Sequence, residues 1–160
     1  MLAACLTLLL AKPYRASLPL SVDGRLYVVR VDGGRGEPLE LLLGGKVLSG
    51  QLKRAWKPWA LQVADVDDDG RPDVCVGIVK ATHQLKQPHT CLWIFGVRDG
   101  ELTRKWLGST MGRPLLRFWF VKTAEGTVLH TIERTLDGRP AEAAYRWKGF
   151  GFKQISSKPR

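Results

Sequence analysis

The sequence predicts an all-β protein, and three observations support this prediction. Seventeen Gly and nine Pro among 160 residues supply turns, short apolar runs alternate with those turns, and the long runs of Ala, Glu, Lys and Leu that favour helices are few. A chain of this length buries roughly two thirds of its unfolded surface, which is enough for one core. We therefore expect a single all-β repeat domain over residues 21–160, preceded by an apolar segment over residues 1–20.

The expected strands follow one another with short turns between them. Asp99-Gly100 and Asp137-Gly138 supply the positive φ that tight hairpins require, so neighbouring strands should pair as sequential hairpins. Residues 74–79 and 92–95 are apolar at nearly every position, which predicts strands covered on both faces, as in a two-layer sandwich or in stacked propeller blades. About eleven strands are expected, over residues 26–31, 39–43, 46–49, 60–66, 74–80, 91–97, 102–107, 115–122, 127–134, 141–147 and 150–155.

A weak internal repeat favours blades over a sandwich. A strand, a Gly-containing turn and a second strand recur around Gly36, Gly70 and Gly126, at spacings of 34 and 56 residues. Repeats of roughly 40 to 50 residues are typical of four-stranded propeller blades. The prediction is a propeller-like meander in about three four-stranded units, fewer than a closed ring needs, and hence an incomplete or small β-propeller.

The acidic residues are concentrated in one segment, since five of the fifteen carboxylates lie between Asp65 and Asp73. Counted from Asp65, carboxylates occupy positions one, three, five and nine, and Gly70 occupies position six, which is the spacing of calcium loops. Two carboxylates about 4 Å apart repel each other by roughly 1 to 4 kcal/mol, so their convergence calls for a cation. The alternative is an open, solvated turn, partly neutralised by Arg71 and Lys57. The predicted calcium ligands are Asp65, Asp67, Asp69, the carbonyl of Arg71, and Asp73, while Asp68 is expected to face solvent.

The segment from Trp59 to Gly77 resembles FG-GAP and VCBS-type repeats, whose pattern is an apolar strand, DxDxDGxxD and a second apolar strand. More loosely, the rest of the chain is similar to small bacterial exported proteins that carry one intact copy of this motif between degenerate ones. The resemblance implies a propeller-like fold, calcium in the loop, and a role in adhesion, ligand binding or scaffolding at the cell envelope. Its partner would be another envelope protein or an anionic polymer.

The beginning of the chain suggests export. Residues 1–11 form an apolar run that is too short to span a bilayer but resembles the centre of a secretory signal. Leu2-Ala3-Ala4-Cys5 also resembles a bacterial lipobox, although it lies very near Met1. We expect an extracytoplasmic protein, secreted or attached to the envelope. For this segment the alternatives are a true start upstream of Met1, a truncated signal or a plain apolar strand.

The two internal cysteines admit two interpretations. If the strands containing Cys75 and Cys91 pair as a hairpin centred on His83, the two residues face each other and can form a disulfide in an oxidising compartment. Two buried free thiols are the alternative.

The net charge of +10 leaves a second function open. Lys and Arg are scattered and form no block, which is typical of a solvated basic surface and gives no strong nucleic-acid signal. The segment from Lys53 to Trp59, however, interleaves basic residues with Trp56 and Trp59, an arrangement that binds polymers by stacking and charge. The alternative function is therefore a basic, tryptophan-bearing binding protein for an anionic cell-wall polymer or nucleic acid.

No catalytic residue is predicted. His83, His89 and His130 have no metal-ligand spacing, and the chain has no nucleophile elbow. Gly33-Gly34-Arg35-Gly36 lacks the lysine and the following helix of a phosphate loop. We expect a protein that is not an enzyme.

Overall fold

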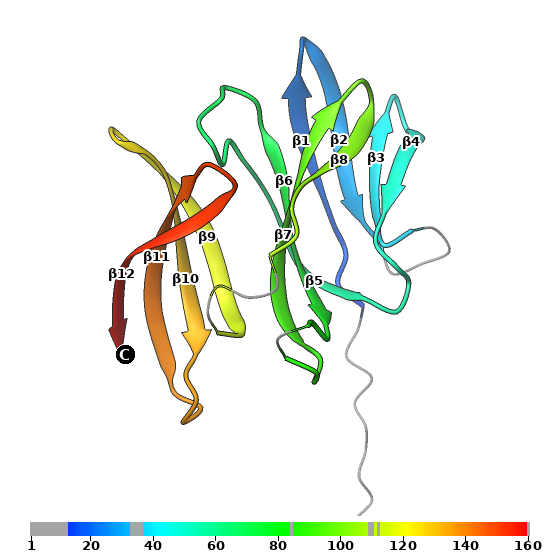
Figure 1. The fold of residues 1–160 in the computed structure, drawn as a ribbon. Coiled ribbons are helices and arrows are strands. Elements are labelled where there is room, and N and C mark those ends of the chain that lie inside the picture. The colour runs from blue at the N-terminus through cyan, green and yellow to red at the C-terminus, as the bar shows by residue number, and fades with distance from the viewer. Residues whose placement is uncertain (1–12, 33–36, 84, 109–110, 112, 160) are drawn as a thin grey trace, which may run out of the picture.

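The fold is built entirely from β-strands. A computed structural model describes residues 13–32, 37–83, 85–108, 111 and 113–159, and within these residues no helix is long and apolar enough to cross a membrane. The described residues form twelve strands (Figure 1). These strands are β1 (Ala16–Val22), β2 (Arg25–Val31), β3 (Leu39–Leu43), β4 (Lys46–Gln51), β5 (Lys57–Ala64), β6 (Asp73–Lys80), β7 (His89–Arg98), β8 (Glu101–Trp106), β9 (Leu115–Thr123), β10 (Gly126–Arg134), β11 (Pro140–Lys148) and β12 (Gly151–Pro159).

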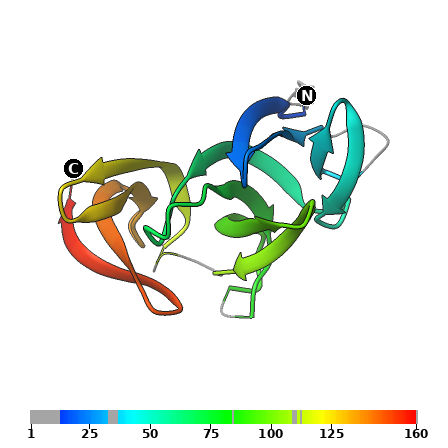
Figure 2. The ribbon, with the colours of Figure 1, turned by 90° about the horizontal axis from the view of Figure 1, so that it is seen from above.

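The twelve strands make three four-stranded antiparallel sheets, each a meander of consecutive strands. We call them the first sheet (β1 to β4), the middle sheet (β5 to β8) and the third sheet (β9 to β12). Seen from above, the middle sheet stands between the other two (Figure 2). The predicted all-β, propeller-like meander of about three units is thus confirmed, and the sheets form no closed barrel.

Two hydrophobic cores fill the two seams between the sheets. One contains residues of the first and middle sheets, such as Val29, Leu41 and Val76. The other contains residues of the middle and third sheets, such as Ile94 and Leu129. Because side chains alternate between the faces of a strand, β6 and β7 supply both cores, and this explains why they are apolar at nearly every residue.

One strand was missing from the expected set. β1, from Ala16 to Val22, falls partly within the segment that was interpreted as an N-terminal tail. Its inward residues Leu20 and Val22 are buried while Ser17 and Ser21 are exposed, so it has a half-polar pattern with no turn signal before it. Residues 1–12, with the expected export segment and the lipobox, lie outside the described residues, as does the Gly33–Gly36 segment.

The missing strand also shifted the alignment of the repeat. The loop around Gly70 joins the first two strands of the middle sheet, and the turn before Gly126 joins the first two strands of the third sheet. Their counterpart in the first sheet is the β1–β2 turn at Asp23-Gly24, whereas Gly36 lies between β2 and β3. The alignment at Gly36 was therefore wrong by one hairpin, and the alignment at Gly126 was correct.

The hairpin centred on His83 was also placed incorrectly. In the β6–β7 pair Cys75 lies opposite Ile94, and Cys91 lies opposite Ile78. The two cysteines consequently point to opposite faces of the middle sheet, one into each core, and both are buried free thiols. The second interpretation of the cysteines is the correct one.

Candidate metal centre

The acidic loop, defined as residues 65–72, joins β5 to β6 at one end of the middle sheet. Its own carboxylates hold it in shape. Asp65 accepts hydrogen bonds from the backbone amides of Asp69 and Gly70, both at 3.0 Å, and Asp69 accepts one from the amide of Arg71 at 2.8 Å. Gly70 has a φ of +84°, which lets the chain reverse there without side-chain strain.

Three of the predicted ligands converge. Asp65, Asp67 and Asp69 each offer a carboxylate oxygen, and these oxygens lie within 4.8 Å of one another. Asp65 and Asp67 are half-buried, whereas Asp69 is exposed, so the group opens to solvent on one side. Carboxylate oxygens are hard ligands of the kind that Ca²⁺, Mg²⁺ and Mn²⁺ prefer. This acidic triad can therefore, in principle, hold a metal ion.

Asp73, the fourth predicted carboxylate, is placed differently. It is the first residue of β6, it is only 2% exposed, and it accepts a hydrogen bond from the backbone amide of Val66 at 3.1 Å. Both of its oxygens lie 2.9 Å from the ammonium of Lys105. Burial raises the pKa of Asp73 to about 6, although Lys105 and the Val66 amide act in the opposite direction.

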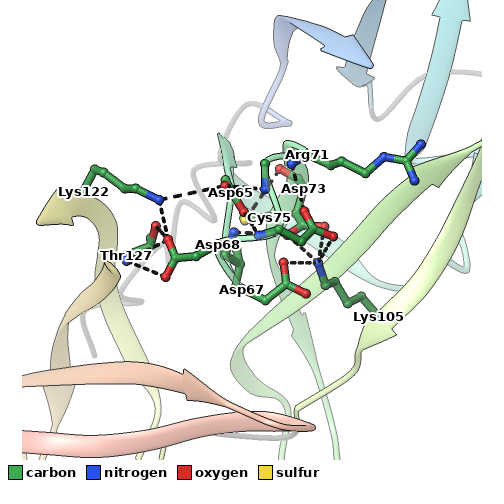
Figure 3. A network of polar contacts seen from close by, with 12 residues as sticks. Asp65, Asp67, Asp68, Arg71, Asp73, Cys75, Lys105, Lys122 and Thr127 are labelled. Atoms are coloured by element: carbon green, nitrogen blue, oxygen red, sulfur yellow. Dashed lines mark hydrogen bonds and ion pairs between the residues drawn. The ribbon is translucent and has the colours of Figure 1, made fainter. Parts of the chain in front are cut away.

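Lys105 projects from β8, and its ammonium lies beside the carboxylates of Asp67 and Asp73 (Figure 3). Besides Asp73, its Nζ contacts Asp67 Oδ1 at 2.7 Å and lies 4.0 Å from Asp69 Oδ2. Burial lowers the pKa of Lys105, but the hydrogen bonds with Asp67 and Asp73 raise it by more, so the lysine remains charged. An ammonium therefore already neutralises part of the acidic loop.

The sequence did not identify Lys105. It suggested Lys57, but Lys57 begins β5 and the loop follows the end of that strand, about 25 Å away at the usual rise per residue. Asp73 lies beside Gly96 on β7, and Gly96 pairs with Thr103 on β8, two residues before Lys105. Ile94 pairs with Trp106 and Phe95 with Arg104, so Lys105 is the extra residue of a bulge in β8, and this register is needed to find its contact with the loop.

Asp68 is exposed, as expected, but its carboxylate is bound. It accepts hydrogen bonds from the backbone amide of Thr127 at 3.0 Å and from the Thr127 hydroxyl at 2.7 Å, and Lys122 lies 2.5 Å away. The hydrogen bonds from Lys122 and Thr127 lower the pKa of Asp68 to about 2. A Cβ on Gly126 would come within 2.4 Å of Asp68 Oδ2, so glycine is needed there for this approach.

The loop also contacts the first sheet. The predicted role of Arg71 concerned its carbonyl, but its side chain extends away from the loop and forms an ion pair with Asp23 in the β1–β2 turn. The acidic loop thus touches the first-hairpin turn of both neighbouring sheets, through Arg71 on one side and Asp68 on the other.

The histidines contribute nothing to this centre. Within the described residues the converging metal-ligating group contains only aspartates. His130 stacks on Trp119, with ring centroids 5.4 Å apart, and Nδ1 of His89 lies 2.9 Å from the carbonyl oxygen of Gln87.

In comparisons with protein-family models, with curated proteins and with solved structures, nothing matches this chain.

Proposed function

We propose that the protein is an extracytoplasmic calcium-binding β-repeat module without catalytic activity, in which one ion stabilises the acidic loop and the sheets serve a structural, adhesive or ligand-binding role. The observation that carries the proposal is the convergence of the Asp65, Asp67 and Asp69 oxygens within 4.8 Å. The resemblance of residues 59–77 to FG-GAP and VCBS-type repeats points to the same ion and to the cell envelope.

Calcium suits this set of ligands better than other hard cations. It accepts six to eight oxygen ligands in a flexible arrangement, whereas Mg²⁺ demands a near-ideal octahedron at shorter distances. The loop supplies three carboxylates on an open side, to which the Arg71 carbonyl, Asp73 and water would add the remaining ligands. An exposed loop with side chains from one short segment is typical of weak extracellular sites, with dissociation constants of about 0.1 to 1 mM.

Calcium and Lys105 compete in this proposal. The Lys105 ammonium contacts Asp67 and Asp73, so an ion bound by either carboxylate has to displace it or share its ligand. The lysine side chain is 19% exposed and has a flexible stem, so it can swing toward solvent. Calcium would then replace the Lys105 ammonium in the loop. Because the ammonium has to be displaced first, the apparent affinity for calcium is reduced.

The non-catalytic part of the proposal rests on how the carboxylates are used. Asp65 holds two loop amides, Asp68 holds the Thr127 amide, and Asp73 holds the Val66 amide and Lys105. Groups engaged in this way hold the backbone in place and are poorly placed to exchange protons with a substrate.

The test is thermal unfolding with a chelator, with calcium and with magnesium. About 1 mM calcium should stabilise the fold by about 0.4 to 1.4 kcal/mol, which raises the melting temperature by about 1 to 5 °C. Asp67→Asn should abolish the increase, and Glu101→Gln, on the exposed start of β8, should retain it. An increase that magnesium reproduces, or that Asp67→Asn retains, contradicts the proposal.

Lys105→Gln tests the competition directly. Without calcium this variant should melt below the wild type, because Asp67 and Asp73 lose their counter-ion, and its calcium-induced increase should be larger than that of the wild type. Lys148→Gln is the matched control, since this exposed lysine ends β11, away from the acidic loop. An equal calcium response in Lys105→Gln and wild type would show that the lysine does not compete.

A further inference from the structure

A pocket lies between the first and middle sheets, apart from the acidic loop. It has a volume of about 330 Å³ and lies where the connector from β4 to β5, residues 52–56, passes over β7 and β8. The side chain of Gln51 donates a hydrogen bond to the carbonyl of Leu102 at 3.3 Å, and the Leu102 amide donates one to the hydroxyl of Ser49 at 3.2 Å. These reciprocal bonds join β4 to β8 and hold the two sides of the pocket together.

The connector forms a fixed rim over this pocket. The amide of Trp56 donates a hydrogen bond to the carbonyl of Lys53 at 2.9 Å, which closes a turn and places both residues along the pocket. Trp56 is half-buried and contacts the buried Trp93 edge to face, with ring centroids 4.8 Å apart. Leu52 has a φ of +80°, a strained conformation for a residue other than glycine. Such strain persists only where the surroundings fix the backbone, and it is common at ligand sites.

The pocket carries excess positive charge. Lys53 and Arg104 line it, and in the described part of the chain neither forms an ion pair with a carboxylate. Lys80 adds a third cation beside it, 4.6 Å from the ring centroid of Trp56 and 4.7 Å from that of Trp93. Glu37 is the one carboxylate in the lining. The walls therefore combine an apolar indole, two unpaired cations, an amide and a single acid.

We propose that this pocket binds one carboxylate-bearing sugar unit of an acidic polysaccharide. The Lys53 ammonium lies over the Trp56 ring, 5.6 Å from its centroid, and would leave it to pair with the carboxylate together with Arg104. Trp56 would then cover the apolar C–H side of the sugar ring, and Glu37 and Gln51 would bond to its hydroxyls. Each of these groups matches a different part of such a sugar, and the volume is at the lower end of the range for ligand pockets, about 300 Å³.

A nucleic acid fits this lining less well. Every nucleotide carries a phosphate charge but offers few hydroxyls, so the Glu37 carboxylate would be repelled without gaining a hydroxyl donor. Binding of single strands usually depends on a basic track with several accessible aromatic faces. Here Trp93 is buried, so Trp56 is the one tryptophan of the lining that a ligand can reach, which is enough for one sugar ring but not for a row of bases. A polymer with one charge per ring and many hydroxyls is the better match.

The test is calorimetric titration of the full chain with a short oligomer of galacturonic acid, in the presence of a chelator so that calcium cannot bridge carboxylates. A neutral hexose oligomer of the same length and a short single-stranded oligonucleotide are the comparison ligands. We expect the acidic oligomer to bind with a dissociation constant of about 1 mM or tighter. Binding should weaken severalfold between about 50 mM and about 300 mM salt.

The variants address the pocket residues. Lys53→Gln and Trp56→Ala should each weaken binding by about tenfold, while Lys148→Gln, at the exposed end of β11, should leave it unchanged. If Trp56→Ala melts far below the wild type, Trp56→Phe and the exposed Lys53 still test the site. The proposal is overturned if the acidic oligomer does not bind, if the neutral sugar or the oligonucleotide binds at least as tightly, or if Lys53→Gln binds like the wild type. Because the chelator removes calcium, these outcomes are independent of the acidic loop.

Discussion

The first hairpin of each sheet ends in a turn at the same end of the structure, but the three turns differ greatly. In the first and third sheets the turn between the two strands has two residues, Asp23-Gly24 and Ala124-Glu125. In the middle sheet the corresponding connection is the eight-residue acidic loop. The short turns only reverse the chain, whereas the long one gathers three carboxylate oxygens within 4.8 Å.

The additional residues also make the acidic loop a junction. Arg71 reaches the short turn of the first sheet, and Asp68 reaches the start of β10 in the third sheet. Two lysines neutralise part of the negative charge of the loop. The side chain of Lys105 is 19% exposed, and that of Lys122 is 63% exposed. The difference between the turns suggests that the acidic loop both orders the middle sheet and connects the three sheets.

The largest expected effect concerns the buried end of the loop. Asp73→Ala removes the acceptor of the Val66 amide and one partner of Lys105, so the free energy of unfolding should fall by about 2 to 4 kcal/mol in urea denaturation. Glu101→Ala, an exposed carboxylate on β8, should change the stability by no more than about 0.5 kcal/mol. A similar fall in the free energy of unfolding for Asp73→Ala and Glu101→Ala would show that the contacts of Asp73 with the Val66 amide and Lys105 add little to stability.

The pH dependence of stability should separate Asp73 from Asp68. The pKa of Asp73 is raised in the folded state to about 6, so the folded protein binds this proton more tightly, and the contribution of Asp73 to stability should fall as the pH rises from about 4 to about 6. Solvent at the open loop screens part of the effect, so we expect about 1 to 2 kcal/mol. Asp73→Asn should lack this component.

Asp68 should show the opposite sign. Its folded-state pKa is lowered to about 2, so its contribution is present above about pH 4 and is lost as the pH falls toward 2. Urea denaturation of wild type, Asp73→Asn and Asp68→Asn from about pH 2 to about pH 7, with chelator present, measures both components. A constant difference between wild type and Asp73→Asn over this range would contradict the assignment for Asp73.

A smaller effect is expected for the contacts between sheets. Asp68→Ala removes the acceptor of the Thr127 amide and hydroxyl and should cost about 1 kcal/mol. Gly126→Ala should cost at least as much, because its Cβ would collide with Asp68 and its φ is +112°. Asp23→Ala, which removes the exposed ion pair with Arg71, should cost between about 0 and 1 kcal/mol. If Asp23→Ala lowers the free energy of unfolding more than Asp68→Ala does, the contact of the loop with the first sheet is the stronger one, contrary to this ranking.

Local patterns in the sequence were sufficient for the class of fold and for the position of the loop. Continuous apolar runs such as residues 74–79 predicted strands covered on both sides, and the structure places them between two cores. The spacing of Asp65, Asp67 and Asp69 around Gly70 predicted their convergence. Each of these features depends on neighbouring residues and on the alternation of side chains along a strand.

Features that depend on pairing between distant segments could not be read in the same way. Lys105 and Lys122 reach the loop from 32 and 54 residues away, through the register of the middle sheet and the packing of the third. The cysteine pairing failed because the β6–β7 register differed by three positions from a hairpin centred on His83, which sends Cys75 and Cys91 to opposite faces. The half-polar strand β1 was missed because Pro19 lies inside it and because residues 1–20 were interpreted as an N-terminal segment.

A calorimetric calcium titration tests the proposed binding of calcium by the acidic loop. We expect one ion per chain with a dissociation constant of about 0.1 to 1 mM for the wild type, tighter binding by Lys105→Gln, and no binding by Asp67→Asn. Absence of binding by both wild type and Lys105→Gln at several millimolar calcium would contradict it, and would show that the Lys105 ammonium is the only cation that this loop requires.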